Sequence, residues 1–269
     1  MAGISAQGLR VFRDGNEVIS TSDFHIPEGS TAAIIGPNGS GKSSILHAIS
    51  GVLDIEGRLD VCGSTPDKAL KNIAYVLQYM PITPGVPLTV REVVQMGRYS
   101  TLGLFGRATP ADRERVAWAM EKLSISNLAD KNIANLSGGQ RQRVFVAQAL
   151  TQDHNILLLD EPLTGLDVPS AKVIDQIIHD EPDDGCTVVF TTHDLDEARA
   201  ADCVILTAGR VVAAGAPDDV LTPEHLAEAY GLGALHPAHA GEHGVLDVAH
   251  EDPEMNEPTS VRQIRGEQL

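Results

Sequence analysis

The 269-residue sequence has few cysteines, no long apolar run and a shortage of basic side chains. Its three cysteines, Cys62, Cys186 and Cys203, are odd in number and widely spaced, so we expect no disulfide framework and a reducing compartment. No run approaches the roughly 18 apolar residues of a membrane-spanning helix. The first residues, MAGISAQGLRVF, lack the features of a signal peptide. We therefore expect any membrane association to depend on a partner.

Lys and Arg number 20 against 37 Asp and Glu, which gives a formal net charge of −17. A chain this acidic is a poor counterion for nucleic acid, so we expect no nucleic-acid partner. The length, together with 42% hydrophobic residues, suits one large α/β domain, alone or with an appendage, and excludes disorder throughout the chain.

Short apolar segments that read as buried strands alternate with helical patterns. The segments are Thr31–Ile35, Ile73–Leu77, Ile156–Leu159, Thr187–Phe190 and Val204–Leu206. Several are apolar at every position, as expected for strands that are covered on both faces. Such strands with helices between them predict a mainly parallel α/β sheet.

Two of the intervening helices have clear sequence signatures. One begins at Thr109-Pro110, where Asp112 completes the pattern of a capping box. Its apolar positions recur at helical spacing, namely Val116, Ala119, Met120 and Leu123. The other helix has an apolar face made of Val144, Ala147 and Leu150.

Residues 36–43 read GPNGSGKS, which fits the phosphate-binding pattern G-x-x-x-x-G-K-[ST] between a strand and a helix. The glycines allow the backbone N–H groups to point at a phosphate, and the helix beginning near Gly41 adds its positive end. Lys42 would contact the β- and γ-phosphates, and the Ser43 hydroxyl would ligate Mg²⁺. The alternative is a glycine-rich turn with an exposed lysine. The predicted nucleotide-binding residues here are Gly36, Pro37, Asn38, Gly39, Ser40, Gly41, Lys42, Ser43 and Ser44.

A second acidic motif, ILLLDEP, covers residues 156–162. Asp160 ends a buried strand at the carboxyl edge of the sheet, where open α/β sheets bind ligands, and it would hold Mg²⁺. Glu161 would polarise the attacking water as a general base. Taken alone, the motif is equally compatible with an ordinary acidic exit from a strand.

Between these motifs lies LSGGQ at Leu136–Gln140, about 20 residues before the Asp-Glu pair. With it, from about Leu9 to Gly231, the sequence resembles the nucleotide-binding subunit of ATP-binding cassette (ABC) transporters. Gln78 falls where the family has its Q-loop, Asp167 falls in the D-loop, and His193 falls at the switch histidine.

The resemblance implies a P-loop NTPase of the ABC type: a mainly parallel core with an N-terminal antiparallel β part and a helical signature subdomain. It also implies a head-to-tail homodimer in which two ATP molecules, with Mg²⁺, lie between one P-loop and the other subunit's signature. Ser137, Gly138, Gly139 and Gln140 would contact the partner's ATP. Further roles are implied for His193 (γ-phosphate contact), Gln78 (sensing Mg²⁺ and water) and Asp167 (coupling between the two sites).

The family usually has an aromatic residue near the start of the chain that stacks on adenine. Counting from Leu9, this position holds Arg13, and Phe12 precedes it. Either side chain could stack on a base, so both stay candidates.

A single cassette with no spanning segment resembles the ATPase subunits of prokaryotic importers, which act with separate permeases and often a substrate-binding protein at the cytoplasmic face of the membrane. Leu88–Arg107 lies where the family receives the permease's coupling helix, although a generic solvated helix pair is the alternative. The sequence of this segment resembles that of the ATPase subunits of manganese, zinc and iron importers, and also that of the subunits for iron-siderophore and cobalamin uptake. LTGLDVPSAKVIDQI and VLTPEHLAEAYG favour the divalent-metal group. Soluble ABC ATPases of translation or DNA repair, and exporters, are weaker alternatives.

We predict an ATPase domain over residues 1–235, with its helical signature subdomain at about 82–150, and an acidic tail over residues 236–269. The tail has little periodicity and is expected to be flexible or loosely docked. Its histidines have spacings that could bind a transition metal, but no fold-defining ligand set accompanies them, so a disordered histidine-bearing extension is favoured. These histidines are His236, His239, His243 and His250, with His225 nearby.

Overall fold

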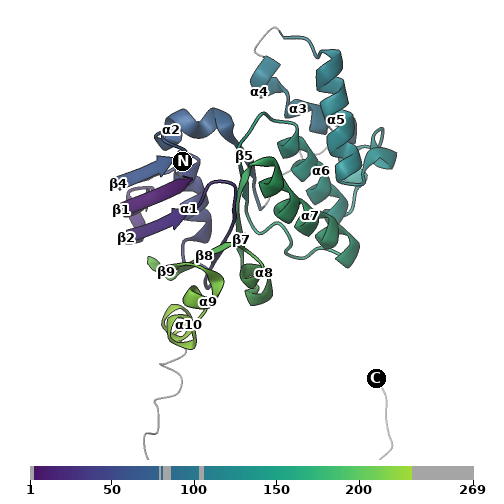
Figure 1. The fold of residues 1–269 in the computed structure, drawn as a ribbon. Helices are drawn as coiled ribbons and strands as arrows, with labels where there is room; N and C mark the ends of the chain where they lie inside the picture. Colours follow the sequence, from purple (N-terminus) through teal and green to yellow (C-terminus); the bar gives the residue numbers. More distant parts are fainter. Residues whose placement is uncertain (1–2, 79, 81–85, 103–105, 232–269) are drawn as a thin grey trace, which may run out of the picture. The chain divides into compact units, whose positions relative to one another are not determined.

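The computed structural model describes residues 3–78, 80, 86–102 and 106–231 (Figure 1). The predicted tail, residues 236–269, lies outside these ranges, as do residues 81–85 at the start of the predicted signature subdomain. Among the described helices, none has the length and apolar character needed to cross a membrane.

The central sheet has six strands in the order β5-β6-β7-β3-β8-β9. They are β3 (Thr31–Ile35), β5 (Ile73–Val76), β6 (Ile156–Leu159), β7 (Thr187–Thr192), β8 (Cys203–Thr207) and β9 (Val211–Gly215). All neighbours are parallel except β8 and β9, which are antiparallel. The five predicted strands are therefore confirmed, and β8 is longer by one residue at each end than the predicted Val204–Leu206.

A separate antiparallel sheet, ordered β2-β1-β4, forms the N-terminal β part that the family resemblance implies. Its strands are β1 (Ile4–Arg13), β2 (Asn16–Ile26) and β4 (Asp54–Val61). The hairpin between β1 and β2 turns at Asp14 and Gly15, whose φ angles of 52° and 77° are those of a tight two-residue turn that follows strand twist.

The helices connect these strands, and several of them begin at a side-chain cap. They are α1 (Lys42–Ile49), α2 (Pro66–Ala69), α3 (Val90–Met96), α4 (Tyr99–Leu102), α5 (Pro110–Lys122), α6 (Gly138–Leu150), α7 (Val168–Asp180), α8 (Leu195–Arg199), α9 (Pro217–Val220) and α10 (Pro223–Tyr230). Short 3-10 turns are η1 (Leu70–Asn72), η2 (Ser126–Leu128), η3 (Ile133–Asn135) and η4 (Glu181–Asp184). The predicted capping box at the start of α5 is confirmed, because Thr109 and Asp112 exchange both hydrogen bonds.

The central strands are buried on both faces, which explains why their sequences are apolar throughout. In β6, Leu157 and Leu159 pack in one core with residues of α3, α5, α6 and α7. Ile156 and Leu158 point the other way, into a second core with α1 and the antiparallel sheet. Figure 1 accordingly shows the antiparallel strands and the helices α5, α6 and α7 on opposite sides of the central sheet.

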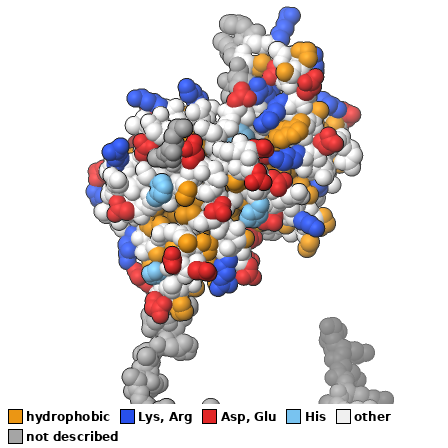
Figure 2. All heavy atoms as spheres, in the orientation of Figure 1, with side chains coloured by type: hydrophobic (Ala, Val, Ile, Leu, Met, Phe, Trp, Pro, Cys, Tyr) orange, Lys and Arg blue, Asp and Glu red, His pale blue; other side chains and the backbone are white. Residues whose placement is uncertain are grey.

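Because β3, β5, β6 and β7 run parallel, their carboxyl ends meet at one edge of the sheet. The P-loop follows β3, Gln78 follows β5 closely, Asp160 follows β6, and His193 follows β7. Topology alone thus brings together motifs that are more than a hundred residues apart in sequence. On the face drawn in Figure 2, acidic and basic side chains are interspersed rather than separated by sign.

Candidate nucleotide site

The P-loop folds back around its own lysine. Lys42 is only 6% exposed, and its Nζ donates to the carbonyl oxygens of Gly36 at 3.0 Å and Pro37 at 3.3 Å. Gly39 and Gly41 adopt φ angles of 80° and 99°, which L side chains rarely adopt. The loop is therefore tightly curled, and the ammonium group of Lys42 is held inside the curl.

Gly41 is also required by packing. A Cβ at this position would lie 2.2 Å from Cδ1 of Ile19 on β2. The antiparallel sheet thus presses directly against the start of α1, and only a glycine leaves room for this contact.

Thr191, which was not predicted from the sequence, forms hydrogen bonds with both acidic residues of the site. Asp160 is 5% exposed, and its Oδ1 accepts from Ser43 Oγ at 3.0 Å and from Thr191 Oγ1 at 2.6 Å. The Glu161 N–H donates to the same Thr191 hydroxyl at 2.7 Å. Thr191 therefore fixes both acidic residues, and its signal in the sequence was a polar residue near the end of an apolar strand.

Glu161 has a positive φ of 47°, which is uncommon for a residue other than glycine and turns the chain sharply after β6. Its Oε2 accepts from Gln78 Nε2 at 2.8 Å. The predicted general base and the predicted Q-loop residue are thus in direct contact.

These residues line one cavity of about 460 Å³, a volume within the usual range for small-molecule sites. Its lining residues are Arg13, Val18, Asn38, Gly39, Ser40, Gly41, Lys42, Ser43, Ser44, Gln78 and Glu161. Val18 was not predicted from the sequence and supplies an apolar side chain from β2. Ser43 offers an oxygen donor at the cavity, and Asp160 lies directly behind it, within hydrogen-bond distance of the Ser43 hydroxyl; oxygen is the donor type that Mg²⁺ prefers. The residues present therefore fit a nucleotide with Mg²⁺.

Of the two candidates for the adenine contact, Arg13 lines this cavity and Phe12 does not. The Arg13 guanidinium donates to Nδ1 of His47 at 3.1 Å and lies 3.4 Å from Ser44 Oγ. Arg10 lies over the Phe12 ring instead, 5.0 Å from its centroid. Burial, and next the Arg13 charge, lower the pKa of His47, which therefore accepts as a neutral ring.

The LSGGQ residues form the N-terminus of helix α6, which is separate from the cavity. Ser137 caps α6 in a capping box with Gln140. A Cβ on Gly139 would lie 2.4 Å from Asp167 Oδ1, so the signature packs against the D-loop of its own chain. None of residues 137–140 lines the P-loop cavity, and Ser137 and Gly138 are exposed. His193 and Asp167 are exposed as well.

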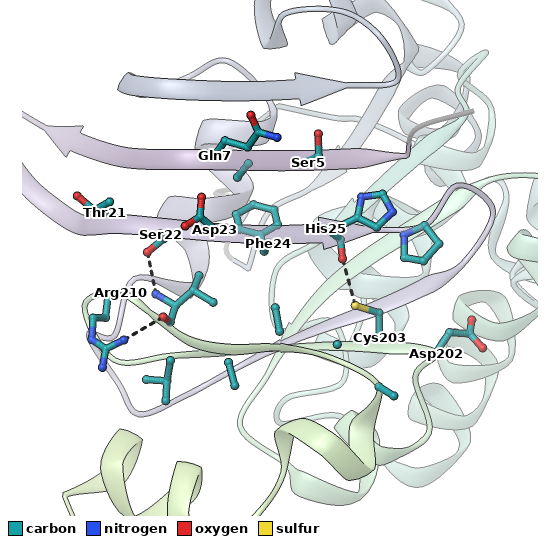
Figure 3. Close-up of a pocket in the computed structure, with 18 residues that line it drawn as sticks. Ser5, Gln7, Thr21, Ser22, Asp23, Phe24, His25, Asp202, Cys203 and Arg210 are labelled. Carbon is teal, nitrogen blue, oxygen red and sulfur yellow. Dashed lines mark hydrogen bonds between the residues drawn. The ribbon is translucent and has the colours of Figure 1, made fainter.

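A larger cavity of about 980 Å³ lies between the antiparallel sheet and the strands β8 and β9 (Figure 3). Its wall includes Phe24, His25, Cys203 and Arg210, and none of the predicted site residues. The chemistry identified from the sequence therefore belongs to the smaller cavity.

Comparison with known proteins points to one family. A family model described as "ABC transporter" matches residues 19–164. The zinc transport system ATP-binding protein TroB of Treponema pallidum is 39% identical over 86% of this chain and 90% of its own length. The manganese transport system protein MntB of Halalkalibacterium halodurans is 35% identical over 84% of this chain and 91% of its own length. The iron(3+)-hydroxamate import ATP-binding protein FhuC of Bacillus subtilis is 34% identical over 87% of this chain and 90% of its own length.

Solved structures give the same picture. A metal-chelate type ABC transporter in an inward-facing conformation matches with a TM-score of 0.71 and 26% identity, covering 85% of this chain and 89% of that one. A dimeric ATP-binding cassette bound to ADP and phosphate after hydrolysis matches with a TM-score of 0.68 and 27% identity. The match covers 80% of this chain and 98% of that one. These structures share the arrangement of the central sheet, antiparallel sheet and helices described above.

Proposed function

The chain belongs to the ABC transporter family, and from this membership we propose that it is the ATP-hydrolysing subunit of an importer of a divalent metal ion. The observation that carries the proposal is the single cavity in which the P-loop, Gln78 and Glu161 meet. Coupling of ATP binding and hydrolysis to transport is the activity of this family.

Residues 1–235 would make up the ATPase domain, with the signature helices within 82–150, and residues 236–269 an additional tail. Lys42 and the inward-facing N–H groups of the P-loop bind the phosphates, and the α1 N-terminus adds its positive dipole. Ser43 and Asp160, with Gln78, would hold Mg²⁺, which neutralises charge on the phosphate oxygens. Arg13 and Val18 lie where the base would contact the antiparallel sheet.

Hydrolysis uses Glu161 as the general base. Its carboxylate takes a proton from the attacking water, whose oxygen bonds to the γ-phosphorus while the bond to the bridging oxygen of ADP breaks. The contact from Gln78, at 2.8 Å, orients the carboxylate. His193, exposed after β7, contacts the γ-phosphate.

We propose a head-to-tail homodimer because each chain has two anion-binding N-termini and only one of them faces its own cavity. Ser137–Gln140 is exposed at its start and would close over the ATP of the second copy, with Asp167 joining the two sites. The dimeric cassette with bound ADP and phosphate supports this arrangement. Loss of γ-phosphate then removes the shared anion and releases the halves.

The family acts with membrane permease subunits, and we propose that α3, α4 and the neighbouring residues up to Arg107 receive the permease at the cytoplasmic face of the membrane. A substrate-binding protein would deliver the metal on the other side. A pull-down in mild detergent should recover an integral-membrane protein. Recovery of ribosomes or DNA without any membrane protein would favour a soluble ABC ATPase instead.

The zinc and manganese relatives support the choice of metal ion. The similarity to FhuC keeps iron-siderophore import as the alternative. Deletion of this chain in its source organism should abolish high-affinity accumulation of manganese, zinc or ferrous iron under limitation. Normal accumulation of these ions with loss of siderophore or cobalamin uptake would establish the alternative.

A further inference from the structure

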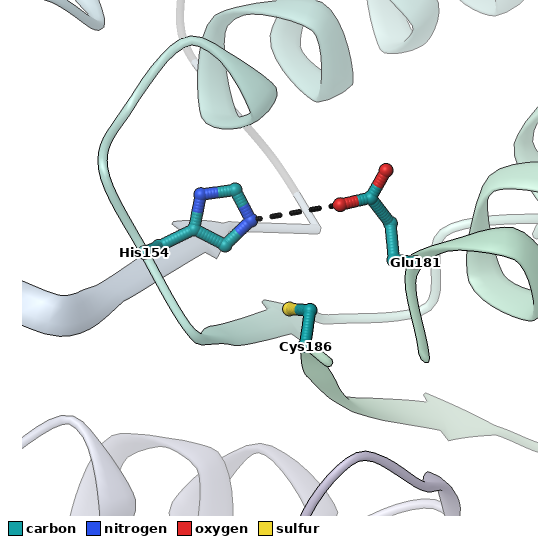
Figure 4. A group of neighbouring side chains, drawn as sticks. All are labelled: His154, Glu181 and Cys186. Carbon is teal, nitrogen blue, oxygen red and sulfur yellow. Dashed lines mark ion pairs between the residues drawn. The ribbon is translucent and has the colours of Figure 1, made fainter. Parts of the chain in front are cut away.

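Three side chains with metal-ligating atoms meet at the amino ends of β6 and β7, away from the nucleotide cavity (Figure 4). His154 precedes β6, Cys186 precedes β7, and Glu181 begins η4. One ligand atom from each of them lies within 4.8 Å of the other two. All three are deeply buried, with side chains 3% exposed for His154 and 6% for Glu181, and with 5% of Cys186 exposed.

The His154 ring is held with one nitrogen ready to bind a cation. Its Nδ1 lies 2.9 Å from the carbonyl oxygen of Gln152, so Nδ1 carries the proton and donates. Nε2 then has a free lone pair, and it is buried with no hydrogen-bond partner among the described residues. A histidine whose second nitrogen is oriented by a backbone carbonyl is the usual form of a metal ligand in proteins.

The unpartnered nitrogen points at a carboxylate oxygen. Nε2 of His154 lies 4.0 Å from Glu181 Oε2, too far for a hydrogen bond (Figure 4). The other oxygen, Oε1, accepts from Lys122 Nζ at 2.8 Å, which fixes the carboxylate and leaves Oε2 facing the ring. Burial lowers the pKa of His154, which favours the neutral ring whose Nε2 can bind a cation.

We propose that His154 Nε2, Glu181 Oε2 and Cys186 Sγ form a binding site for a divalent transition-metal ion of the zinc class. Nitrogen, carboxylate oxygen and thiolate sulfur together suit zinc and its neighbours, whereas Mg²⁺ prefers oxygen alone. Bonds of about 2.0–2.3 Å in a tetrahedron put ligand atoms roughly 3.5 Å apart. Small side-chain rotations close the present spacing, and the fourth position stays open for water.

The cluster lies next to a cavity of about 570 Å³, which His154 lines together with Asn72, Arg98, Asp112 and Arg115. Binding requires the Cys186 thiol to lose its proton, and burial raises the pKa of this thiol to about 12. The metal ion therefore replaces one proton on sulfur, and each ion bound releases one proton to the solvent.

Cobalt(II) is the probe that tests the proposal, because a thiolate ligand gives it a sulfur-to-metal charge-transfer absorption. The chelator-treated, reduced full chain is titrated with cobalt chloride while proton release is followed. We expect the charge-transfer band to saturate at one equivalent, with one proton released, and to disappear when zinc is added. Cys186→Ser should remove the band, and His154→Gln should weaken binding at least tenfold.

Cys203→Ser is the matched control, because Cys203 is a buried thiol, 3% exposed, that lies outside the cluster. It should keep the band. A wild-type titration without a thiolate band, including one that shows only histidine-type visible absorption, would overturn the proposal, as would a band that survives Cys186→Ser. If Cys186→Ser does not fold, the His154→Gln variant is titrated instead. Cobalt affinity within tenfold of the wild type would then overturn the proposal.

Discussion

Replacing Glu161 by Gln separates hydrolysis from nucleotide binding. The amide has almost the same shape as the carboxylate, and its oxygen still accepts the hydrogen bond that Gln78 Nε2 now donates at 2.8 Å. The hydrogen bond to Thr191 Oγ1 is donated by the backbone N–H of residue 161, so a change of the side chain at this position leaves it in place. The substitution therefore removes the ability to take a proton and leaves the cavity in place.

The expected loss follows from this difference. A positioned general base contributes roughly 10² to 10⁴ in rate, so kcat should fall by that factor, which corresponds to about 3–5 kcal/mol of transition-state stabilisation. Nucleotide affinity should stay within about threefold, because in the proposed site the phosphate contacts come from Lys42 and the P-loop amides and not from Glu161. A nucleotide-stabilised dimer should accumulate, since closure depends on a γ-phosphate that is no longer removed.

The assay is steady-state phosphate release by the full chain, paired with equilibrium binding of a fluorescent ATP analogue. Glu121→Gln is the control, because it makes the same charge change at an exposed position on α5. If Glu161→Gln turned over within tenfold of the wild type, Glu161 would not be the general base. If affinity fell as much as kcat, its role would be in binding instead.

Three further predictions concern the signature and the buried arginine of the helical region. Gly139→Ala should abolish steady-state hydrolysis while single-chain nucleotide binding persists, because its Cβ would lie 2.4 Å from Asp167 Oδ1; Gly138→Ala, whose Cβ would meet open space within the single chain, should leave the free energy of unfolding of the single chain unchanged. Arg98→Ala should lower the free energy of unfolding in urea by about 3 kcal/mol, since it leaves the buried Asp112 carboxylate without its ion pair; a loss under 1 kcal/mol would contradict this. Hydrogen bonds from Thr109 and then Arg98 lower the pKa of Asp112 to about 2, so its contribution to stability is complete above about pH 4 and is lost as the pH falls toward 2. Asp112→Asn should therefore flatten that part of the stability profile, and an unchanged slope would refute the assignment.

The sequence predicted the elements whose signals are local. Strands buried on both faces have unbroken apolar runs, and the α5 capping box needs only Thr109 and Asp112, three residues apart. The motif residues at the carboxyl edge follow from strand direction once the sheet is parallel, because strand ends then meet. For this reason Asp160 and the P-loop could be placed together from the sequence, whereas the placement of Gln78 depended on the family resemblance.

The adenine contact could not be decided by counting residues from Leu9. Side chains in β1 alternate between its two faces, so Phe12 shares a face with Arg10 and Arg13 lies on the other face. The one-residue register shift between β1 and β2 beside them falls in β2 and leaves this alternation unchanged. Which face of β1 meets the cavity depends on how the sheets pack and has no local signal in the sequence; the structure places Arg13 there.

Contacts between segments that are far apart in the sequence could not be predicted either. Val18 lies at the cavity because β2 packs against the start of α1, and the close approach of Ile19 to Gly41 is a property of the assembled sheets. The cluster of His154, Glu181 and Cys186 has no recognisable ligand spacing in the sequence, since its members come from the starts of two strands and from η4. Only parallel pairing of β6 with β7 brings these starts together.

Local charge, rather than the net charge of −17, decides whether this chain can hold a polyanion. Charges farther away than the Debye length, about 8–10 Å at physiological salt, contribute little to the potential at the P-loop. What remains near the place of the phosphates is the nearly buried Lys42 and the positive end of α1. Asp160 and Glu161 lie close enough to repel ATP, and the divalent cation proposed above would offset that repulsion at Asp160. Nucleotide affinity should therefore depend more strongly on Mg²⁺ than on monovalent salt.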